Sequence, residues 1–445
     1  MEDIAKVASD YFDNLFSARP CDQMDKCLDA VSCKVTPNMQ NILSSEFNVE
    51  EIKTTLFQIG PTKALGPDGM NVLFYQKFWH IVGDSVIITI LDFLNSGYMV
   101  PKINHTNIVF IPKVKNPEKM TDFKPISLCN IIYKIISKIL ANRLKQVLSH
   151  IISPTQSAFV LGRLITNNVL VATLHAMHSR KKGKNGSLAL KLDISKVYDR
   201  VKWPFLQGIM QRMGFSKRWI IRVMGCVTTP SFSVLINGKP FGNIHQSRGI
   251  RQEDPFHHIC FFCVQRVLLP CWQRRNWRGV SMEYPFVEEH QQSLTCYLQM
   301  TLCCYAGETH NEAEAIVDVL QVYAKALGQS INLEKSSVYF SGNTPCDKKE
   351  EIMGTLGVKK VERFESYLGL PILIGCAKYQ NFSFLKDRVW KKLQGWKGML
   401  LSRSGKEVLI KVVTQSIPTY TMGVFQLPMK LCEELNSMCA RFWWG

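Results

Sequence analysis

The clearest alternation of apolar and polar positions along the chain occurs at residues 188–193. Leu188, Leu190 and Leu192 stand at every second position, so their side chains share one face of a predicted strand. Asp193 follows on the opposite face. A carboxylate near the end of a buried strand is either the N-cap of a helix that follows or a metal ligand, and the local pattern leaves both interpretations open.

Helical periodicity is strongest in two other stretches. Between Ile131 and Val147 the apolar residues recur at helical spacing, and lysines give the predicted helix a basic side. The stretch from Asn311 to Leu327 is also amphipathic, and Gly328 is the expected C-terminal stop. Both patterns predict helices that bury one face and expose the other.

Two further segments have strand and turn signals. Asn107–Pro112 is a short apolar run that ends at proline, and it predicts a strand followed by a basic loop. Asn237-Gly238 is a strong signal for a tight hairpin turn, and Phe232–Ile236 precedes it as a predicted strand. These signals alternate with the predicted helices, so the chain is expected to be a mixed helical and sheet protein.

Composition and charge favour a globular protein with a polyanionic partner. The chain has 445 residues, of which 46% are hydrophobic and 20% charged, enough to bury a sizeable core. The 54 Lys and Arg exceed the 36 Asp and Glu, giving a net charge of +18. Nucleic acid is the favoured partner, and a merely soluble basic protein is the alternative.

Cysteine use and the apolar runs indicate an intracellular protein. Cys260-Phe-Phe-Cys263 is a lone pair without the repeated spacing of a zinc site, and the scattered cysteines favour a reducing compartment. The longest apolar run, residues 86–94, is too short to span a bilayer. The N-terminus lacks a basic start and an apolar signal core. We therefore expect a nuclear or cytoplasmic location, without membrane association.

One motif connects these features to a known family. The segment Lys191-Leu-Asp-Ile-Ser-Lys-Val-Tyr-Asp-Arg200, followed by Val-Lys-Trp-Pro-Phe-Leu, resembles the first catalytic motif of reverse transcriptases from plant LINE-type (non-LTR) retrotransposons. The resemblance covers nearly the whole chain. It implies an α+β right-hand polymerase, with an antiparallel palm sheet flanked by helices. The implied domains are a helical lead-in (1–60), fingers (61–185), a palm (186–375) and a truncated thumb (376–445).

Other segments resemble further motifs of the same family. The turn at residues 66–69 resembles the one that opens the fingers. Gly249–Pro255 resembles the second palm motif, except that Glu253 stands where the family has glycine. Gly328–Ser337 resembles the fourth palm motif, and Ser366–Pro371 resembles the hairpin that grips the primer end.

The resemblance also implies roles for individual residues. Asp193, helped by the Ile194 carbonyl, would bind catalytic Mg²⁺, and Lys335 would protonate the leaving pyrophosphate. A solvated surface lysine is the alternative for Lys335. Tyr198 would exclude a ribose 2′-hydroxyl, with a buried aromatic as the alternative.

The remaining roles concern substrates. Gln252 would touch the substrate or the template base, whereas Asp199 is expected to be structural, pairing with Arg200 or capping a helix. The expected partners are an RNA template, a DNA primer or RNA–DNA hybrid, and dNTPs. The candidates for phosphate contacts are Lys113 and Lys124, and those for template contacts are Arg163 and Arg251.

The second half of the catalytic site is missing from the sequence. Two-metal nucleotidyl transfer needs carboxylates from two strands. The family supplies them from a hairpin that reads Phe/Tyr-Ala-Asp-Asp, and this chain has Tyr297-Leu-Gln299-Met300 at that place. Gln299 and Met300 are therefore lost metal positions, and the chain as written is not expected to polymerise.

A shifted reading frame explains the loss. Codons allowed for Thr295–Cys304, read from the third base, spell Leu-Leu-Phe-Ala-Asp-Asp-Ser, which is the missing motif. The same offset from Pro255 spells Leu-Ser-Pro-Tyr-Leu-Phe-Leu-Leu-Cys-Ala-Glu, the family's usual continuation. We infer that roughly residues 256–304 are translated out of frame, because the gene has decayed or its coding sequence was assembled wrongly. The aromatic and basic cluster Trp272–Trp277 and the cysteine pair are then artefacts of the frame.

Three hypotheses follow. The chain is an RNA-directed DNA polymerase by descent, a catalytically inactive remnant that binds nucleic acid, or a non-functional product of a decayed element that does not fold well. The family's elements carry an upstream endonuclease, and none precedes Met1. The chain is therefore expected to be a fragment.

Overall fold

The structure is a computed structural model with side chains. It describes residues 2–18, 24–152, 162–164, 166–167, 169–170, 173, 186–252, 254, 260, 296–298, 301–307, 309–361, 366–367, 369–371, 377–396, 399 and 401–444. The basic stretch at 181–186, apart from its last residue, lies outside these ranges. So do Glu253 and the segment Trp272–Trp277.

Residues 2–18 and 24–60 are largely helical. Their helices are α1 (Glu2–Phe16), α2 (Met24–Leu28), α3 (Pro37–Ser44) and α4 (Val49–Phe57). Polar side chains begin two of them, since Thr36 accepts a hydrogen bond from the Met39 amide and Asn48 accepts one from the Glu51 amide. The helices α5 (Val72–Lys77), α6 (Trp79–Ser96) and α7 (Pro101–Asn104) follow.

A four-stranded sheet joins two strands from the range predicted as fingers (61–185) to two strands from the range predicted as palm (186–375). Its strands, in spatial order, are β2 (Phe123–Cys129), β1 (His105–Pro112), β4 (Ser231–Ile236) and β5 (Lys239–His245). The β4–β5 turn is Asn237-Gly238, with φ angles of 50° and 79°, which confirms the predicted hairpin. Phe12 and Phe16 of α1 pack on this sheet against Phe232, so the N-terminal helix is part of this core.

The long helix α8 (Ile131–Ile151) confirms the helix predicted between Ile131 and Val147, and it packs against α3 and α4 of the lead-in. Arg143 is 4% exposed and forms an ion pair with Glu51 of α4, with Nη2 and Oε2 2.7 Å apart. Its guanidinium also donates to the carbonyls of Ser45 and Glu46. A buried arginine in this position fixes α8 against α3 and α4.

This ion pair gives a test of how the lead-in is held. Glu51→Ala is expected to lower the free energy of unfolding by about 2–3 kcal/mol, because it leaves the Arg143 charge buried without its carboxylate. The neighbouring Glu50 is exposed, so Glu50→Ala is the matched control and should cost less than about 0.5 kcal/mol. Urea unfolding followed by circular dichroism measures both. Equal losses in the two variants would contradict the structural role given to the pair.

The second sheet is the predicted palm. Its spatial order is β10 (Lys359–Lys360), β9 (Ser337–Phe340), β3 (Ser187–Ser195), β7 (Thr301–Gly307) and β6 (Cys296–Leu298), with β8 (Ser330–Ile331) also paired to β3. All these pairings are antiparallel except β9 with β10. Leu188, Leu190 and Leu192 are at most 2% exposed, so the alternating face is in the core.

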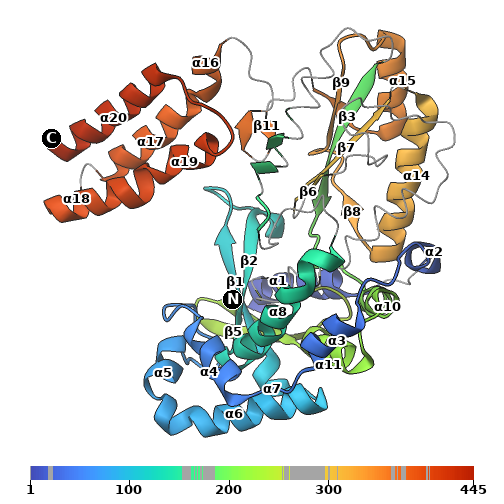
Figure 1. The fold of residues 1–445 in the computed structure, drawn as a ribbon, viewed down its shortest axis with the longest axis vertical. Coiled ribbons are helices and arrows are strands. Elements are labelled where there is room, and N and C mark those ends of the chain that lie inside the picture. The colour runs from blue at the N-terminus through green and yellow to red at the C-terminus, as the bar shows by residue number, and fades with distance from the viewer. Residues whose placement is uncertain are drawn as a thin grey trace.

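Helices pack against the palm sheet (Figure 1). The amphipathic stretch forms α14 (His310–Leu327), which begins at an N-cap on Thr309 and ends at Gly328 with a φ of 79°. It packs beside α15 (Cys346–Leu356). The helices α10 (Trp203–Met213) and α11 (Lys217–Thr228) connect β3 to β4. A largely antiparallel sheet with helices against it is the predicted palm architecture.

The C-terminal residues form a helical lobe with its own core (Figure 1). A short hairpin precedes it, in which Ser366 pairs with Pro371 and Tyr367 with Leu370, as predicted for this segment. No helix in the described parts of the chain is long and apolar enough to cross a membrane. The elements of the hairpin and the lobe are β11 (Ser366–Tyr367), β12 (Leu370–Pro371), α16 (Lys378–Phe382), α17 (Phe384–Trp396), α18 (Arg403–Leu409), a π-helical turn (Ile410–Thr414), α19 (Ser416–Met422) and α20 (Met429–Trp444).

Candidate active site in the palm

Asp193 lies within β3, at the centre of the palm sheet. The chain stays extended through Ser195 and then turns, and the next helix begins only at Trp203. Asp193 is therefore not the N-cap of a following helix, which was the simpler of the two interpretations. Its side chain is half-buried.

The backbone of Asp193 is fixed by the turn that precedes β9. The Asn332 amide donates to the Asp193 carbonyl at 2.8 Å, and the Asp193 amide donates to the Ser336 hydroxyl at 3.1 Å. The turn is itself closed by a bond of 2.7 Å from the Ser336 hydroxyl to the Asn332 carbonyl. Sequence analysis recognised this motif but assigned no role to Asn332 or Ser336, which anchor the strand that carries the carboxylate.

The same turn places Lys335 within electrostatic reach of Asp193. Burial raises the pKa of Asp193, whereas the charges of Lys335 and Lys191 oppose that rise. Lys335 is exposed, and its amide donates to the Asn332 side chain at 3.2 Å. The structure thus brings together the two residues predicted to take part in the transfer step, and the role of Lys335 as an acid stays a prediction.

The register of the sheet locates the hairpin that should carry the second pair of carboxylates. Leu298 at the end of β6 pairs with Thr301 at the start of β7, and Thr301 pairs with Asp193. The two residues that join these strands in the sequence are Gln299 and Met300, which lie outside the described residues. The strand ends that flank them are therefore level with Asp193.

The side chains present do not fit a site for two cations. Mg²⁺ takes oxygen ligands, and paired sites need several carboxylates. Within the described ranges no group of three or more His, Cys, Asp or Glu side chains is placed to hold a metal ion. Gln299 and Met300 add no carboxylate. Asp193 and Ile194 are adjacent in β3, and their roles as metal ligands stay predictions.

The second palm motif packs closely on the turn that follows β3. Gly249 has a φ of 98°, and its amide donates to the Val201 carbonyl at 2.7 Å. A Cβ at Gly249 would lie 2.8 Å from the Asp199 carbonyl oxygen, so only glycine fits here. The next amide, of Ile250, donates to the Tyr198 carbonyl at 2.8 Å. Tyr198 is 4% exposed, so its ring is buried here, and its selection of deoxynucleotides stays a prediction.

Gln252 contacts Asp199. Its side-chain amide donates to both carboxylate oxygens, at 2.8 and 2.9 Å. Asp199 is buried, and burial raises its pKa from 3.8 to about 6 despite the Gln252 hydrogen bond and the charges of Lys196 and Arg200. The Gln252–Asp199 contact joins the first palm motif to the second. The structural role of Asp199 and the substrate contact of Gln252 stay predictions.

The raised pKa of Asp199 predicts a pH dependence of stability. Because the folded-state pKa is higher than the unfolded-state pKa, the folded protein binds more protons between about pH 4 and 6, and its stability falls as pH rises through this window. Asp199→Asn removes the ionisation. The unfolding free energy of this variant minus that of the wild type should therefore increase by up to about 3 kcal/mol as the pH rises from about 4 to 6. Urea unfolding at several pH values measures this, and a constant difference would contradict the assignment.

Arg251 occupies a buried polar cluster. It is 4% exposed, it donates to the side chain and carbonyl of Asn104, and it stacks over Tyr133 at 4.1 Å from the ring centroid. The Tyr133 hydroxyl donates to Asp254. These contacts differ from the template contact predicted for Arg251, because its guanidinium faces the protein interior. The cluster fixes the second palm motif to α7 and α8.

Three basic candidates lie in the range predicted as fingers. The Lys113 ammonium donates to the Thr121 carbonyl at 2.9 Å in the β1–β2 loop. Lys124 is exposed on β2, and Arg163 donates to the Ser149 carbonyl at 3.0 Å near the end of α8. The phosphate and template roles of these three residues stay predictions.

Comparison with known proteins agrees with this architecture. Residues 111–372, more than half of the chain, match the family "Reverse transcriptase (RNA-dependent DNA polymerase)". The chain is 25% identical over its full length to the "Transposon TX1 uncharacterized 149 kDa protein" of Xenopus laevis, covering 34% of that protein. It is 26% identical over 205 residues, 46% of its length, to the "Retrovirus-related Pol polyprotein from type-2 retrotransposable element R2DM" of Drosophila melanogaster, covering 19% of that protein.

A shorter match comes from a plant. Over 76 residues, 17% of its length, the chain is 29% identical to the "Putative ribonuclease H protein At1g65750" of Arabidopsis thaliana, covering 12% of that protein. The chain spans about a third or less of the length of these relatives. With the family match, the right-hand fold and the palm motifs around Asp193, the chain belongs to the reverse transcriptase family and carries the reverse transcriptase domain of a non-LTR retrotransposon.

Proposed function

We propose that this chain descends from an RNA-directed DNA polymerase of a plant LINE-type element and, as written, binds a primer–template without extending it. The observation that supports this is the register of the palm hairpin. Thr301 pairs with Asp193, and the residues just before Thr301 are Gln299 and Met300. The likeness to an Arabidopsis protein supports the plant origin.

Loss of extension follows from charge. Reverse transcriptases generally use Mg²⁺, which supplies the charge that stabilises the reacting phosphate. Asp193 brings one carboxylate to the palm, and the hairpin brings an amide and a thioether. This chain's own residues can still orient substrates, since Asn332 and Ser336 hold the strand and Gln252 holds the second motif to the first. They do not supply the charge that primer attack requires.

Retention of binding follows from the basic surface. The net charge of +18 and the exposed lysines of the fingers favour a polyanion. We propose that the substrates are an RNA template and a DNA primer, which form an RNA–DNA hybrid in the palm, together with a dNTP. Binding is expected to weaken by more than about tenfold between roughly 50 and 200 mM salt, because phosphate contacts release counterions.

The experiment combines binding with extension on the purified full chain. Fluorescence anisotropy of a labelled RNA–DNA hybrid measures affinity against salt, and a labelled dNTP measures extension with Mg²⁺. The expected result is salt-sensitive binding with no detectable product. Primer extension by this chain would contradict the claim of inactivity. A hybrid affinity that does not change with salt concentration would contradict the claim of a phosphate-binding surface.

A further inference from the structure

A small cavity lies between the end of α1 and the second palm motif. Phe12 and Phe16 of α1 and Phe232 of β4 form an apolar part of its wall, and each of them is at most 4% exposed. Gln246, which follows β5, and Arg251 of the second palm motif lie on the polar part of the wall. The cavity is thus bordered by segments that are far apart in the sequence.

Two of the polar side chains that line the cavity are buried without a full set of partners. Gln246 is 8% exposed and Arg251 is 4% exposed. In the described part of the chain, nothing donates to the Gln246 Oε1 atom, and nothing accepts from the Arg251 Nε and Nη1 atoms. The third nitrogen of Arg251, Nη2, donates to Asn104, and the nearby Cys129 thiol is only a weak acceptor. An acceptor and donors therefore remain unpaired at one cavity, which is costly in a buried position.

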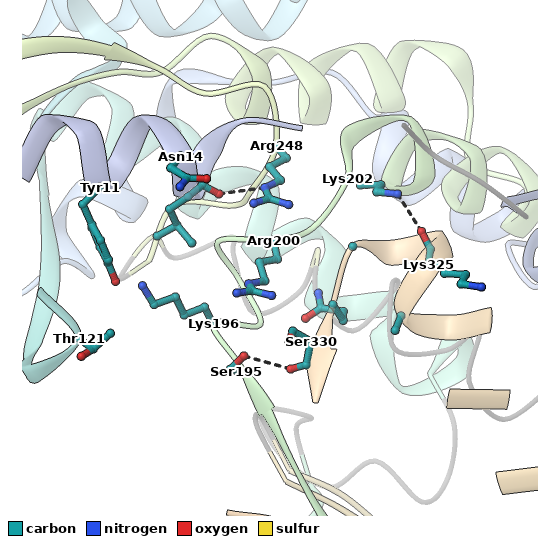
Figure 2. Close-up of a pocket in the computed structure, with 14 residues that line it drawn as sticks. Tyr11, Asn14, Thr121, Ser195, Lys196, Arg200, Lys202, Arg248, Lys325 and Ser330 are labelled. Atoms are coloured by element: carbon teal, nitrogen blue, oxygen red, sulfur yellow. Dashed lines mark hydrogen bonds between the residues drawn. The ribbon is translucent and has the colours of Figure 1, made fainter. Parts of the chain in front are cut away.

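Hydrogen bonds hold the backbone on the Gln246 side of the cavity. The Ser247 amide donates to the Phe16 carbonyl at 3.0 Å. The Arg248 Nε atom donates to the Leu15 carbonyl at 2.9 Å (Figure 2). The segment that carries Gln246 is therefore held to the end of α1, which favours a small bridging molecule over a rearrangement that would close the cavity.

The size of the cavity suits one water molecule. The centre of a water molecule can occupy about 10 Å³ of it, and on this measure one water needs about 10–15 Å³. A water molecule can accept a hydrogen bond from Arg251 and donate one to Gln246, and the Ser127 hydroxyl on the same wall offers a further partner. A halide ion could only accept, and it would lie close to the Gln246 oxygen and to Asp199, which also lines the cavity. Water is therefore the favoured occupant.

We propose that one water molecule occupies this cavity and bridges Gln246 to Arg251. The water accepts a hydrogen bond from the Arg251 guanidinium and donates one to the Gln246 side-chain carbonyl. It thereby extends the hydrogen-bond network from the end of α1 to the second palm motif, next to Gln252. The site concerns an internal water rather than a substrate, and the proposal does not depend on polymerase activity.

A crystal structure of the full chain, at a resolution that shows ordered water, tests the proposal without a variant. The expected result is electron density within about 2.7–3.2 Å of both the Gln246 Oε1 atom and an Arg251 nitrogen. Soaking the crystals in bromide distinguishes water from a halide ion, because bromide gives an anomalous signal. A direct hydrogen bond between Gln246 and Arg251, a cavity without density, or an anomalous peak in the cavity would overturn the proposal.

Magnetic relaxation dispersion of ¹⁷O-labelled water counts long-lived internal water molecules in solution. Gln246→Met keeps the approximate size of the side chain but removes its hydrogen-bond acceptor, so the count should fall by one relative to the wild type. Gln211 is an exposed residue of α10, and Gln211→Met should leave the count unchanged. Circular dichroism checks that both variants are folded. An equal count in the wild type and in a folded Gln246→Met variant would also overturn the proposal.

Discussion

Replacing residues 256–304 with those read from the third base of the same codons should convert an inactive chain into a template-dependent DNA polymerase. The replacement puts aspartates at positions 299 and 300, next to position 301, which pairs with Asp193 in the sheet. We expect incorporation at least about a thousandfold above the original chain, because metal-held charge stabilisation is worth several kcal/mol. Incorporation of labelled dTTP on an RNA template with a complementary DNA primer measures this.

The control for this replacement separates folding from chemistry. The restored chain and the original chain should bind the RNA–DNA hybrid with affinities within about threefold, since the fingers are identical and phosphate contacts supply most of the affinity. The double variant Gln299→Asp/Met300→Asp in the original frame tests whether the two carboxylates suffice without the surrounding hairpin. A restored chain that is folded and binds the hybrid, yet incorporates nothing, would contradict the mechanism.

Removing the carboxylate of Asp193 from the restored chain should abolish its activity. Asp193→Asn keeps the size and the backbone bonds to Asn332 and Ser336, but it removes the charge that a cation requires. We expect kcat to fall by at least about a thousandfold with little change in hybrid affinity. Asp92 is an exposed residue of α6, so Asp92→Asn is the matched control and should leave kcat unchanged.

The outcome for Asp193→Asn distinguishes two roles. A ligand of the catalytic cations is needed in the transition state, so its loss lowers kcat while primer–template binding is kept. If the carboxylate only stabilises the sheet, its loss would instead lower thermal stability and reduce kcat and hybrid affinity together. A loss of less than tenfold in kcat, in a folded variant, would refute the metal role.

Local patterns in the sequence predicted the elements that position the site. The alternation at Leu188–Leu192 and the amphipathic stretch that became α14 are periodic signals, and short-range backbone geometry alone explains them. Asn237-Gly238 likewise encodes its own turn. Family motifs also singled out Lys335, whose charge acts on Asp193 in the structure, and its role as an acid stays a prediction.

Contacts between side chains distant in sequence were not predictable in the same way. Gln252 reaches Asp199, and Arg251 reaches Asn104, because the β4–β5 hairpin brings the second motif back across the first. Nothing in the local sequence specifies these partners.

Two independent arguments identify the same two positions. Reading the allowed codons in the shifted frame places the acidic pair at 299 and 300 from the sequence alone. The sheet register identifies those positions as the residues that join β6 to β7, next to the partner of Asp193. The register uses only backbone pairing, so it does not depend on the choice of codons. Their agreement supports a frame error over an unrelated insertion.

The most direct measurement is the nucleotide sequence of the gene and its transcript from the codon of Asp254 to the codon of Gly307. We predict that the third-base frame spells Leu-Ser-Pro-Tyr soon after Asp254, and Phe-Ala-Asp-Asp at positions 297–300. A sequence in which no frame encodes an acidic pair between these codons would contradict the proposed ancestry of the site and the explanation of its inactivity.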